Sequence, residues 1–425
     1  MRELPNNSYY AATANDWRPP PLEASRERYD VVVIGSGFTG LSAALGCAEK
    51  GLSVALLEAK TIGYGASGRN GGQLIPGLRW SMREVDAEFG RERARAIFNL
   101  AYGAVDRVSD RIARHGIDCD LKAGHLEAAY KPGHFDAMQR DAEFLAQEFG
   151  WGAEVIQPQD MGQHIDGGGY HGGIYDRRGG HFHPLNYALG LAKAAAVAGV
   201  DIFENNRCGG WFDFSKDDDR EFEVLAEANL RTKHLIIATD SWTQDMDREL
   251  GRFTIPIMNY NIATAPLANA DALLPSDAAV ADSRFVLNYF RLSADKRLIF
   301  GGGEKYGQTP PADIAAFVRK HMTGVFPSLA GTPIHYAWGG AVGVTMNRLP
   351  HMGRRGNVFF AHGFSGHGAL VTTLAGELLA DAVVGTMEKF DVFASLPHRP
   401  FPGGRLFARP LATLGLLWYA MRDRL

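Results

Sequence analysis

The residues of this sequence best suited to chemistry are glycines grouped with a few polar side chains. Gly35, Gly37 and Gly40 have the spacing G-x-G-x-x-G. This spacing allows a tight turn, a close approach of a pyrophosphate to the backbone, and close packing of a helix on a strand. Glu58 follows 18 residues after Gly40, where a carboxylate can accept hydrogen bonds from ribose hydroxyls and disfavours a 2′-phosphate. The pattern predicts a dinucleotide-binding site.

A second cluster covers residues 63–73 (GYGASGRNGGQ), shortly after the predicted strand that ends at Leu57. The run offers many backbone N–H groups, the polar side chains of Ser67 and Asn70, and the cation of Arg69. A long ligand with a second phosphate and a polar ring system fits such a run, so we expect a flavin rather than a nicotinamide. The alternative interpretation is a flexible surface loop rich in glycine.

A third cluster, residues 361–368 (AHGFSGHG), leads from a short apolar strand into a helix. The N-terminus of that helix carries a partial positive charge, which would stabilise the negative charge of a reduced flavin near its N1 and O2 atoms. His362 and His367 lie in this run. Each is either part of the site or a buried structural histidine.

The composition is that of a globular protein and narrows the functions to consider. Of the 425 residues, 46% are hydrophobic and 22% are charged, and the formal charge of −4 shows no excess of basic residues. We therefore expect no nucleic-acid-binding surface. Cys47, Cys119 and Cys208 form no C-x-x-C pair, so we predict no metal site, no disulfide framework and a cytoplasmic location. Residues 1–21 show no secretory signal, and the apolar stretch 411–421 is shorter than the roughly 18 residues of a membrane span.

Alternating strand and helix patterns predict how the clusters are positioned. A buried strand at 29–34, a helix at 41–50 and a buried strand at 53–57 form one βαβ unit around the first cluster. Helical periodicity predicts one long helix over 84–115. The remaining predicted elements are helices at 132–149, 183–198 and 369–384, strands at 200–203, 210–214, 221–226, 233–239 and 358–361, and antiparallel strands at 253–265 and 286–301.

These elements predict an α/β protein with two domains. The predicted first domain is discontinuous and contains the glycine clusters, whereas the second is built from the segments inserted between its parts. The first domain comprises 29–80, 180–240 and 340–390, the second comprises 81–179 and 241–339, and residues 391–425 form a C-terminal tail.

Taken together, the motifs resemble those of a known enzyme family. The chain resembles the FAD-dependent amine and amino-acid oxidoreductases of the D-amino-acid oxidase superfamily. Five motifs carry this resemblance: the glycine triplet with Glu58, residues 65–73, residues 236–239 (IIAT), Trp338 with Gly339, and residues 363–368. Residues 8–12 (SYYAA) and 397–405 (PHRPFPGGR) are similar to those of the members that act on γ-glutamylputrescine. The resemblance implies a Rossmann-like FAD-binding domain joined to an antiparallel-sheet substrate domain.

The resemblance also implies cofactor contacts. The first cluster would hold the pyrophosphate and Glu58 the ribose, the second would lie along the pyrophosphate and flavin, and the backbone near Cys208 and Ala238 would contact the adenine. The implied FAD-binding residues are Gly35, Ser36, Gly37, Phe38, Thr39, Gly40, Glu58, Ala59, Lys60, Ser67, Gly68, Arg69, Asn70, Gly71, Gly72, Gln73, Cys208, Ala238, Gly363, Ser365, Gly366, His367, Gly368 and Leu370.

Two departures from the family pattern carry predictions. Relatives that bind flavin covalently do so through a cysteine near the position of Trp338 and Gly339. No cysteine stands there in this chain, so we expect non-covalent FAD. Relatives that take α-amino acids have a lysine just after the third cluster, where this chain has Ala369 and Leu370. A small α-amino acid would therefore lose the usual anchor for its carboxylate.

The motifs name no catalytic residue, because the cofactor supplies the chemistry in such enzymes. Candidates for the wall of an amine pocket are Tyr260, Tyr289, Phe290, Trp338 and His351. Aromatic residues at strand spacing more often lie in a core, which is the alternative for this set.

Lys296 and Arg297 lie in a predicted hairpin turn. Relatives keep an oxygen-activating lysine near this position, and the alternative interpretation is a solvated turn.

From the resemblance we expect oxidation of a primary amine, γ-glutamylputrescine or a related polyamine-type substrate, to an aldehyde with ammonia and hydrogen peroxide. The expected partners are this small amine and dioxygen, with no nucleic acid and no membrane contact. Two alternatives stay open: a dehydrogenase that passes electrons from an amine or amino acid to a quinone or other carrier, and an FAD-binding subunit without amine chemistry. We expect the apolar segment 406–425 to dock on its own domain or on a second subunit.

Overall fold

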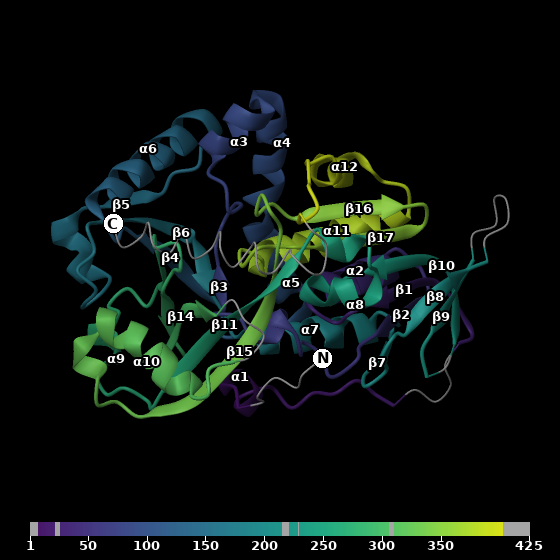
Figure 1. Ribbon diagram of the computed structural model, residues 1–425, viewed down its shortest axis with the longest axis horizontal. Helices are drawn as coiled ribbons and strands as arrows, with labels where there is room; N and C mark the ends of the chain where they lie inside the picture. Colours follow the sequence, from purple (N-terminus) through teal and green to yellow (C-terminus); the bar gives the residue numbers. More distant parts are fainter. Residues whose placement is uncertain (1–6, 22–25, 215–220, 228, 306–309, 403–425) are drawn as a thin grey trace.

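The computed structural model describes residues 7–21, 26–214, 221–227, 229–305 and 310–402, and the predicted docking segment 406–425 lies outside these ranges. The chain forms two β-sheets with helices packed on them (Figure 1). This arrangement confirms the predicted α/β class with two sheets. Within the described ranges, no helix has an apolar stretch that is long enough to cross a bilayer.

The first sheet contains the strands on either side of the first glycine cluster. Its central strands pair in parallel, in the order β17, β10, β1, β2 and β7, and β16 pairs antiparallel with β17 at one edge. Residues 31–34 of β1 are all buried, as expected for a strand covered on both faces. The strands of this sheet are β1 (Arg28–Ile34), β2 (Val54–Leu57), β7 (Asp201–Phe203), β8 (Gly210–Asp213), β9 (Phe222–Leu225), β10 (Leu230–Ile237), β16 (His351–Arg355) and β17 (Val358–His362).

Helices α2 (Phe38–Glu49) and α11 (Ala369–Val383) cross closely beside this sheet. At the crossing, a Cβ atom on Gly376 would lie 2.4 Å from the carbonyl oxygen of Thr39. A glycine is therefore required there, because any side chain would force the two helices apart. Helices α7 (Pro184–Val197) and α12 (Glu388–Ala394) complete this layer.

The single long helix predicted over 84–115 is wrong. The segment forms three helices: α3 (Met82–Phe89), α4 (Arg91–Ala101) and α5 (Ala104–His115). Gly90 has a φ of +80° and ends α3, a conformation that glycine adopts without strain. The hydrophobic period continues across this break, so periodicity alone did not reveal it. Helix α5 packs against α7 and α11, next to the first sheet.

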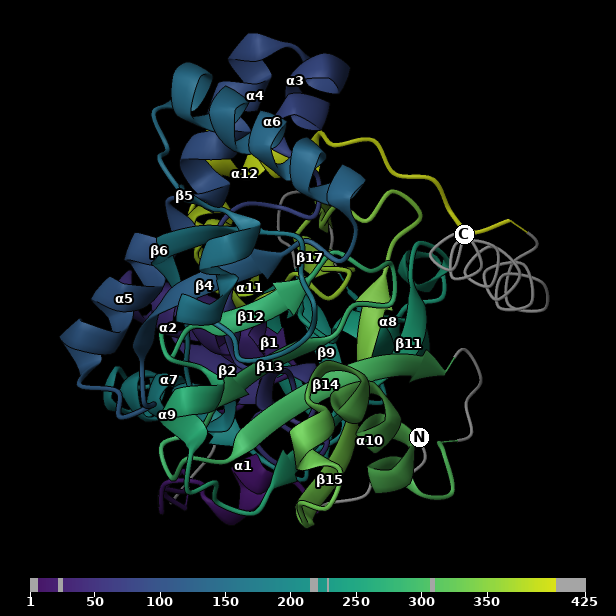
Figure 2. The same cartoon turned by 90° about the vertical axis from the view of Figure 1, so that its left-hand side faces the viewer.

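The second sheet is mainly antiparallel, with the order β15, β11, β14, β13, β12, β4, β6 and β3. Figure 2 shows β11, β14, β13 and β12 side by side. Helix α10 packs against β14 and β11 on one face. The strands are β3 (Gln73–Leu74), β4 (Lys122–Ala128), β5 (Glu154–Ile156), β6 (Gly173–His181), β11 (Ile255–Thr264), β12 (Ala279–Asp282), β13 (Tyr289–Leu292), β14 (Leu298–Lys305) and β15 (Ile334–Val344), and the remaining helices are α1 (Tyr9–Ala12), α6 (Pro132–Phe149), α8 (Thr243–Met246), α9 (Ala270–Leu273) and α10 (Ile314–Val325).

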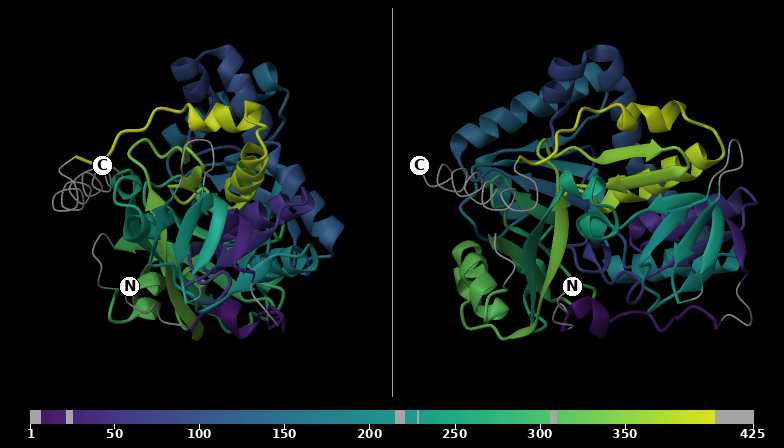
Figure 3. Two further views of the ribbon diagram at one scale, coloured as in Figure 1. Left: turned by 90° about the vertical axis from the view of Figure 1, so that its right-hand side faces the viewer. Right: turned by 45° about the vertical axis from the view of Figure 1, so that its right-hand side comes forward.

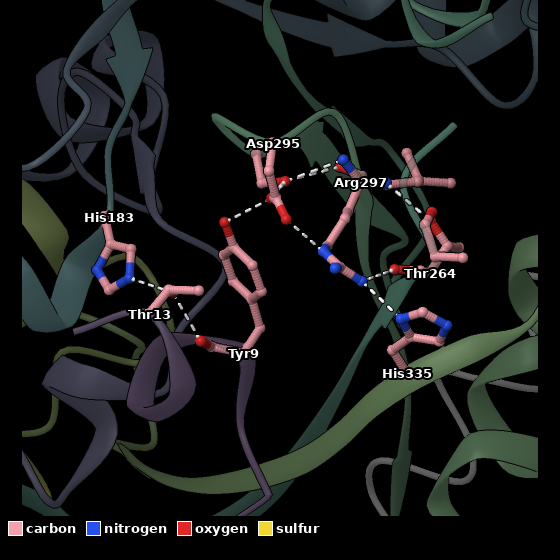
Figure 4. Close-up of polar contacts among 10 residues, drawn as sticks. Tyr9, Thr13, His183, Thr264, Asp295, Arg297 and His335 are labelled. Atoms are coloured by element: carbon pink, nitrogen blue, oxygen red, sulfur yellow. Dashed lines mark hydrogen bonds and ion pairs between the residues drawn. The ribbon is translucent and has the colours of Figure 1, made fainter. Parts of the chain in front are cut away.

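The N-terminal segment is attached to the second sheet. Its described residues 7–21, drawn in purple, run along the bottom of the molecule past β15 (Figure 3). The Tyr9 hydroxyl donates a hydrogen bond of 2.8 Å to Asp295, which also pairs with Arg297 (Figure 4). Lys296 pairs with Asp271 at the surface. Neither Lys296 nor Arg297 lines the cavity described below; the solvated-turn interpretation fits Lys296, whereas the side chain of Arg297 is 13% exposed and donates to the carbonyl oxygen of Thr264.

The crossing of α2 and α11 gives a prediction about stability. We expect Gly376→Ala to lower the free energy of unfolding by roughly 1–3 kcal/mol, because the new methyl group would overlap backbone atoms of α2. Gly324→Ala in α10 is the matched control, since nothing lies within 4 Å of its added Cβ. Gly324→Ala should leave the free energy of unfolding unchanged or raise it by roughly 0.5–1 kcal/mol. Urea unfolding measures both, and equal effects of the two substitutions would contradict the crossing.

Candidate cofactor and substrate site

A cavity of about 860 Å³ is lined by residues of both sheets, and all three glycine clusters reach its wall. This volume lies within the range of roughly 300–1,000 Å³ usual for ligand and cofactor sites. Its wall has two parts. The clusters, β1, β2 and β11 form one part, which we call the cofactor wall. Residues of β4, β6, α3, α6 and the segment 75–80 form the other, which we call the substrate wall.

The first cluster is folded tightly against the end of β10. Gly35 has a φ of +104°, and a Cβ atom there would lie 2.6 Å from the carbonyl oxygen of Ala238. A Cβ atom on Gly40 would lie 1.8 Å from the carbonyl oxygen of Gly35. Helix α2 therefore begins directly at the cavity, where its N-cap residue Gly37 has no side chain and the Ser67 hydroxyl accepts from the N–H of Phe38 at 3.0 Å. Free backbone N–H groups at a helix N-terminus are suited to a phosphate.

Glu58, at the end of β2, lines the cavity and is held in place by its neighbours. One carboxylate oxygen accepts hydrogen bonds from the backbone N–H and the hydroxyl of Ser36, at 3.0 and 2.7 Å. The other accepts from the N–H of Lys60 at 2.9 Å. Carboxylate oxygens have further lone pairs, so the group can still accept hydrogen bonds from a ligand.

The second cluster is not a flexible surface loop, because it is hydrogen-bonded to the second sheet. The carbonyl oxygen of Arg69 accepts hydrogen bonds from the indole of Trp338 (3.0 Å) and the amide of Asn261 (3.2 Å). The amide of Asn70 closes the turn by donating to Ser67 at 2.9 Å. These bonds fix the run along the wall of the cavity.

A buried arginine, Arg291, supports the same run from behind. It donates to the carbonyl oxygen of Gly71 at 2.9 Å and to the hydroxyl of Tyr10 at 3.2 Å. Tyr10 in turn packs edge-on against Trp338, with ring centroids 5.2 Å apart. Sequence reasoning assigned no role to Arg291, and residues 8–12 entered it only as part of a resemblance.

Asp240 is a second residue that sequence reasoning missed. It lines the cavity just after β10, and its two carboxylate oxygens accept hydrogen bonds from Gly363 (2.8 Å) and Gly343 (2.9 Å). Burial raises the pKa of Asp240, while the donors oppose that rise. Its place after a predicted strand of the first sheet was the available signal, since polar groups there face a ligand crevice.

The third cluster leads into α11, whose N-terminus reaches the cavity without a side-chain cap. Leu370 does not face the cavity, because it lies on the core side of α11 and is 1% exposed. Ala369 lines the cavity in its place, so this position still carries no cation. His367 lines the cavity, and burial lowers its pKa to about 4, which leaves the ring neutral at pH 7.

The structure brings most of the predicted cofactor residues together at one cavity, although their contacts with FAD stay a prediction. Six of them do not line it: Gly40, Lys60, Gly68, Gly72, Gly363 and Leu370. The predicted residues that line the cavity are Gly35, Ser36, Gly37, Phe38, Thr39, Glu58, Ala59, Ser67, Arg69, Asn70, Gly71, Gln73, Cys208, Ala238, Ser365, Gly366, His367 and Gly368.

Of the predicted amine-pocket residues, only Tyr289 lines the cavity. Its ring lies over Gly71, where an added Cβ would come within 2.5 Å of it, and its hydroxyl donates to Asn259. Tyr260 and Phe290 lie in the core of the second sheet, because side chains alternate between the two faces of a strand.

Trp338 and His351 also lie away from the cavity. Trp338 is fully buried against the N-terminal segment. His351 on β16 hydrogen-bonds to His362 at 2.8 Å and packs against His398, and burial lowers its pKa to about 2. His351 and His362 are therefore neutral structural histidines at pH 7.

The FAD implied by the sequence fits the cofactor wall. The glycines leave a cradle that side chains would fill, the two helix N-termini that begin at the cavity suit its phosphates and pyrimidine ring, and Glu58 suits a ribose. Among the described residues, no group of histidine, cysteine, aspartate and glutamate is placed to hold a metal ion.

Comparisons with known proteins agree with this arrangement. The family model for FAD dependent oxidoreductases matches residues 30–382. The γ-glutamylputrescine oxidoreductase of Escherichia coli K12 is 35% identical over 423 residues, which cover 99% of this chain and 98% of that protein. Glycine oxidase from Geobacillus kaustophilus has a similar structure, with a TM-score of 0.70 and 21% identity, over 84% of this chain and 95% of that one. L-proline dehydrogenase from P. horikoshii has a TM-score of 0.70 and 19% identity, over 86% of this chain and 98% of that one.

Glu58 gives a prediction about cofactor affinity. We expect Glu58→Ala to weaken FAD binding roughly ten- to hundred-fold, because it removes a charged acceptor for the ribose hydroxyls. Glu88→Ala, at an exposed position of α3 outside the cavity, is the control. Titration of apoprotein with FAD, followed by flavin fluorescence, measures both affinities. Unchanged affinity in Glu58→Ala would show that the carboxylate does not hold the cofactor.

Cysteine positions give a prediction about cofactor release. All three cysteines are free and buried, and of these only Cys208 lines the cavity. We expect acid precipitation to release all of the FAD into the supernatant, because the predicted attachment position carries no cysteine. Flavin that stays with the precipitate, and is lost from it in Cys208→Ser, would show a covalent bond at Cys208 instead.

Proposed function

The chain belongs to the family of FAD-dependent oxidoreductases, and from this premise we propose that it oxidises a primary amine of the γ-glutamylputrescine or polyamine type. The products are an aldehyde and ammonia, and dioxygen is reduced to hydrogen peroxide. The observation that supports this most is the similarity to γ-glutamylputrescine oxidoreductase along nearly the whole of both chains. We place the enzyme in the cytoplasm, because its three cysteines are free.

The chain's own residues bind and orient the reactants. When bound, FAD supplies the acceptor for the hydride of the C–N bond that is oxidised. The N-termini of α2 and α11 point their N–H groups at the cavity, and Asp240 holds the turn that leads into α11. Tyr289 and Asn259, both on the second sheet, hydrogen-bond to each other at the cavity wall. In the proposed reaction, these groups would orient the reacting carbon toward the cofactor.

The amine must reach the reacting end as a neutral group, since a protonated amine cannot release hydride to an acceptor. His367 lines the cavity as a neutral ring, and its Nε2 has no partner among the described residues. This nitrogen can accept a hydrogen bond from an entering ammonium. The uncharged Ala369 beside it leaves no anchor for a carboxylate on the reacting carbon. The site therefore suits an amine without an adjacent carboxylate.

An anaerobic amine screen tests the proposal. We expect γ-glutamylputrescine or a polyamine to bleach the flavin absorbance faster than glycine, sarcosine or D-alanine, because no cation stands at Ala369. Admission of air should restore the oxidised spectrum and produce one hydrogen peroxide per amine. Slow reoxidation in air with rapid reoxidation by a quinone would favour the dehydrogenase alternative. Absence of bleaching by every amine would favour the FAD-binding subunit.

A further inference from the structure

The substrate wall carries two opposite charges that make no hydrogen bond or ion pair with the residues that the structure describes. Glu127 on β4 and Arg79, between β3 and α3, both line the cavity. In the described part of the chain, neither side chain makes a hydrogen bond or an ion pair. Both side chains are exposed at the cavity, so each is open to a ligand. Desolvation in the cavity raises the pKa of Glu127, and the charge of Arg79 opposes this rise.

The other acids of this wall are already occupied. Asp141 on α6 pairs with Arg83 at 2.7 Å. Asp176 on β6 accepts hydrogen bonds from the indole of Trp151 at 2.7 Å and a backbone N–H at 2.9 Å. Glu84 caps α3 by accepting from the N–H of Ser81. Glu127 thus differs from its neighbours, because it makes no hydrogen bond or ion pair with any residue of the described ranges.

His125 adds a second open polar group beside Glu127. It lies two residues earlier on β4, so both side chains are on the same face of the strand, and both line the cavity. The ring is 4% exposed, and its Nε2 has no hydrogen-bond partner among the described residues. A buried polar atom without a partner is costly unless a ligand or water supplies one.

The substrate wall meets the cofactor wall at the third cluster, where the ring of His367 lies against the backbone of residues 75–77 and near Arg79. Its elements are α3, α6, β4 and β6, and α3 and α6 lie side by side in Figure 2. The first and third glycine clusters follow strands of the first sheet, and the second cluster is the loop of residues 63–73. A substrate whose reacting carbon meets the cofactor can extend along this wall and place its far end against Glu127 and Arg79, since both line the same cavity.

We propose that Glu127 and Arg79 form the subsite for the far end of the substrate, and that this end carries an ammonium and a carboxylate on one carbon. A guanidinium binds a carboxylate through two parallel hydrogen bonds, and a carboxylate accepts from an ammonium. The γ-glutamyl group has both charges in this arrangement. A plain diamine would leave its second ammonium facing Arg79, which is unfavourable. The proposal rests on the proposed function, because it assumes an amine that reacts at its other end.

A binding experiment tests the subsite without turnover. The probe is γ-glutamyl-n-butylamide, which keeps the α-ammonium and carboxylate of the far end but has a methyl group in place of the terminal amine that would be oxidised. Calorimetry on the FAD-loaded enzyme should show binding that Glu127→Gln and Arg79→Gln each weaken at least ten-fold. Glu143→Gln and Arg140→Gln, exposed on α6 outside the cavity, are the matched controls and should leave the affinity unchanged. Equal affinity in all four variants would overturn the subsite.

Anaerobic flavin reduction then separates this subsite from the proposed function. The two site variants should lose ten- to hundred-fold in kcat/KM for γ-glutamylputrescine and change little for N-acetylputrescine, which has a neutral far end. Arg79→Gln should raise kcat/KM for putrescine, because it removes the cation that would face the second ammonium of this diamine. Equal losses on all three amines would overturn the subsite while the amine activity stands. If no amine reduces the flavin but the probe binds and both variants weaken it, the proposed function fails and the subsite stands.

Folding of the variants is checked by FAD content and thermal midpoint. Both should match the unmodified enzyme, because neither side chain makes a structural hydrogen bond or ion pair with the described residues. Arg79→Lys is a second variant at the same position. It keeps the charge but loses the paired donors, so it should bind the probe more weakly than the unmodified enzyme and more tightly than Arg79→Gln. The opposite order would count against carboxylate recognition by Arg79.

Discussion

The carboxylate of Asp240 joins the two sheets at the point where the cavity begins. One oxygen accepts from Gly343 at the end of β15, in the second sheet, and the other from Gly363 just after β17, in the first. Without the carboxylate, two backbone N–H groups would lose their acceptor, and each such loss costs roughly 1–3 kcal/mol. Since α11 starts a few residues after Gly363, its N-terminus is placed in the cavity through this contact. The two sheets are therefore held together at the cavity by a residue that belongs to none of the three glycine clusters.

The parts of the fold that were predictable from the sequence are those in which local pattern and burial agree. The strand before Gly35 and the helix after it follow a pattern that only a βαβ unit satisfies, and Glu58 lies where that unit needs an acid. The sequence predicted Leu370 at the cofactor site, but the structure places it on the core side of α11. In the first turn of that helix, Ala369 faces the cavity and the next residue faces the core. Alternation along β11 likewise put Asn259 in the cavity and Tyr260 in the core. A sequence gives the period of such an element but not which face meets the ligand.

Long-range polar contacts were beyond prediction for a different reason. Arg291 is 1% exposed and makes its hydrogen bonds to carbonyl oxygens and to the hydroxyl of Tyr10, which is 281 residues away in sequence. No local pattern links these two residues. Their contact explains physically why residues 8–12 belong with the second cluster: the N-terminal helix covers an arginine that holds the backbone of that cluster. Residues 8–12, which entered the sequence analysis only as a resemblance to relatives, thus have a structural role behind the site.

The two walls of the cavity bind by different physical means, and this division has a consequence for specificity. The cofactor wall relies on backbone N–H groups, helix N-termini and glycines whose substitution would distort the fold. The substrate wall uses the side chains of Glu127 and Arg79, which no structural bond constrains among the described residues. Side chains of this second kind can change without disturbing the sheets or the cofactor cradle. A single fold can therefore keep its redox chemistry constant while the far end of the accepted amine varies, because the groups that recognise that end are separate from those that hold the cofactor.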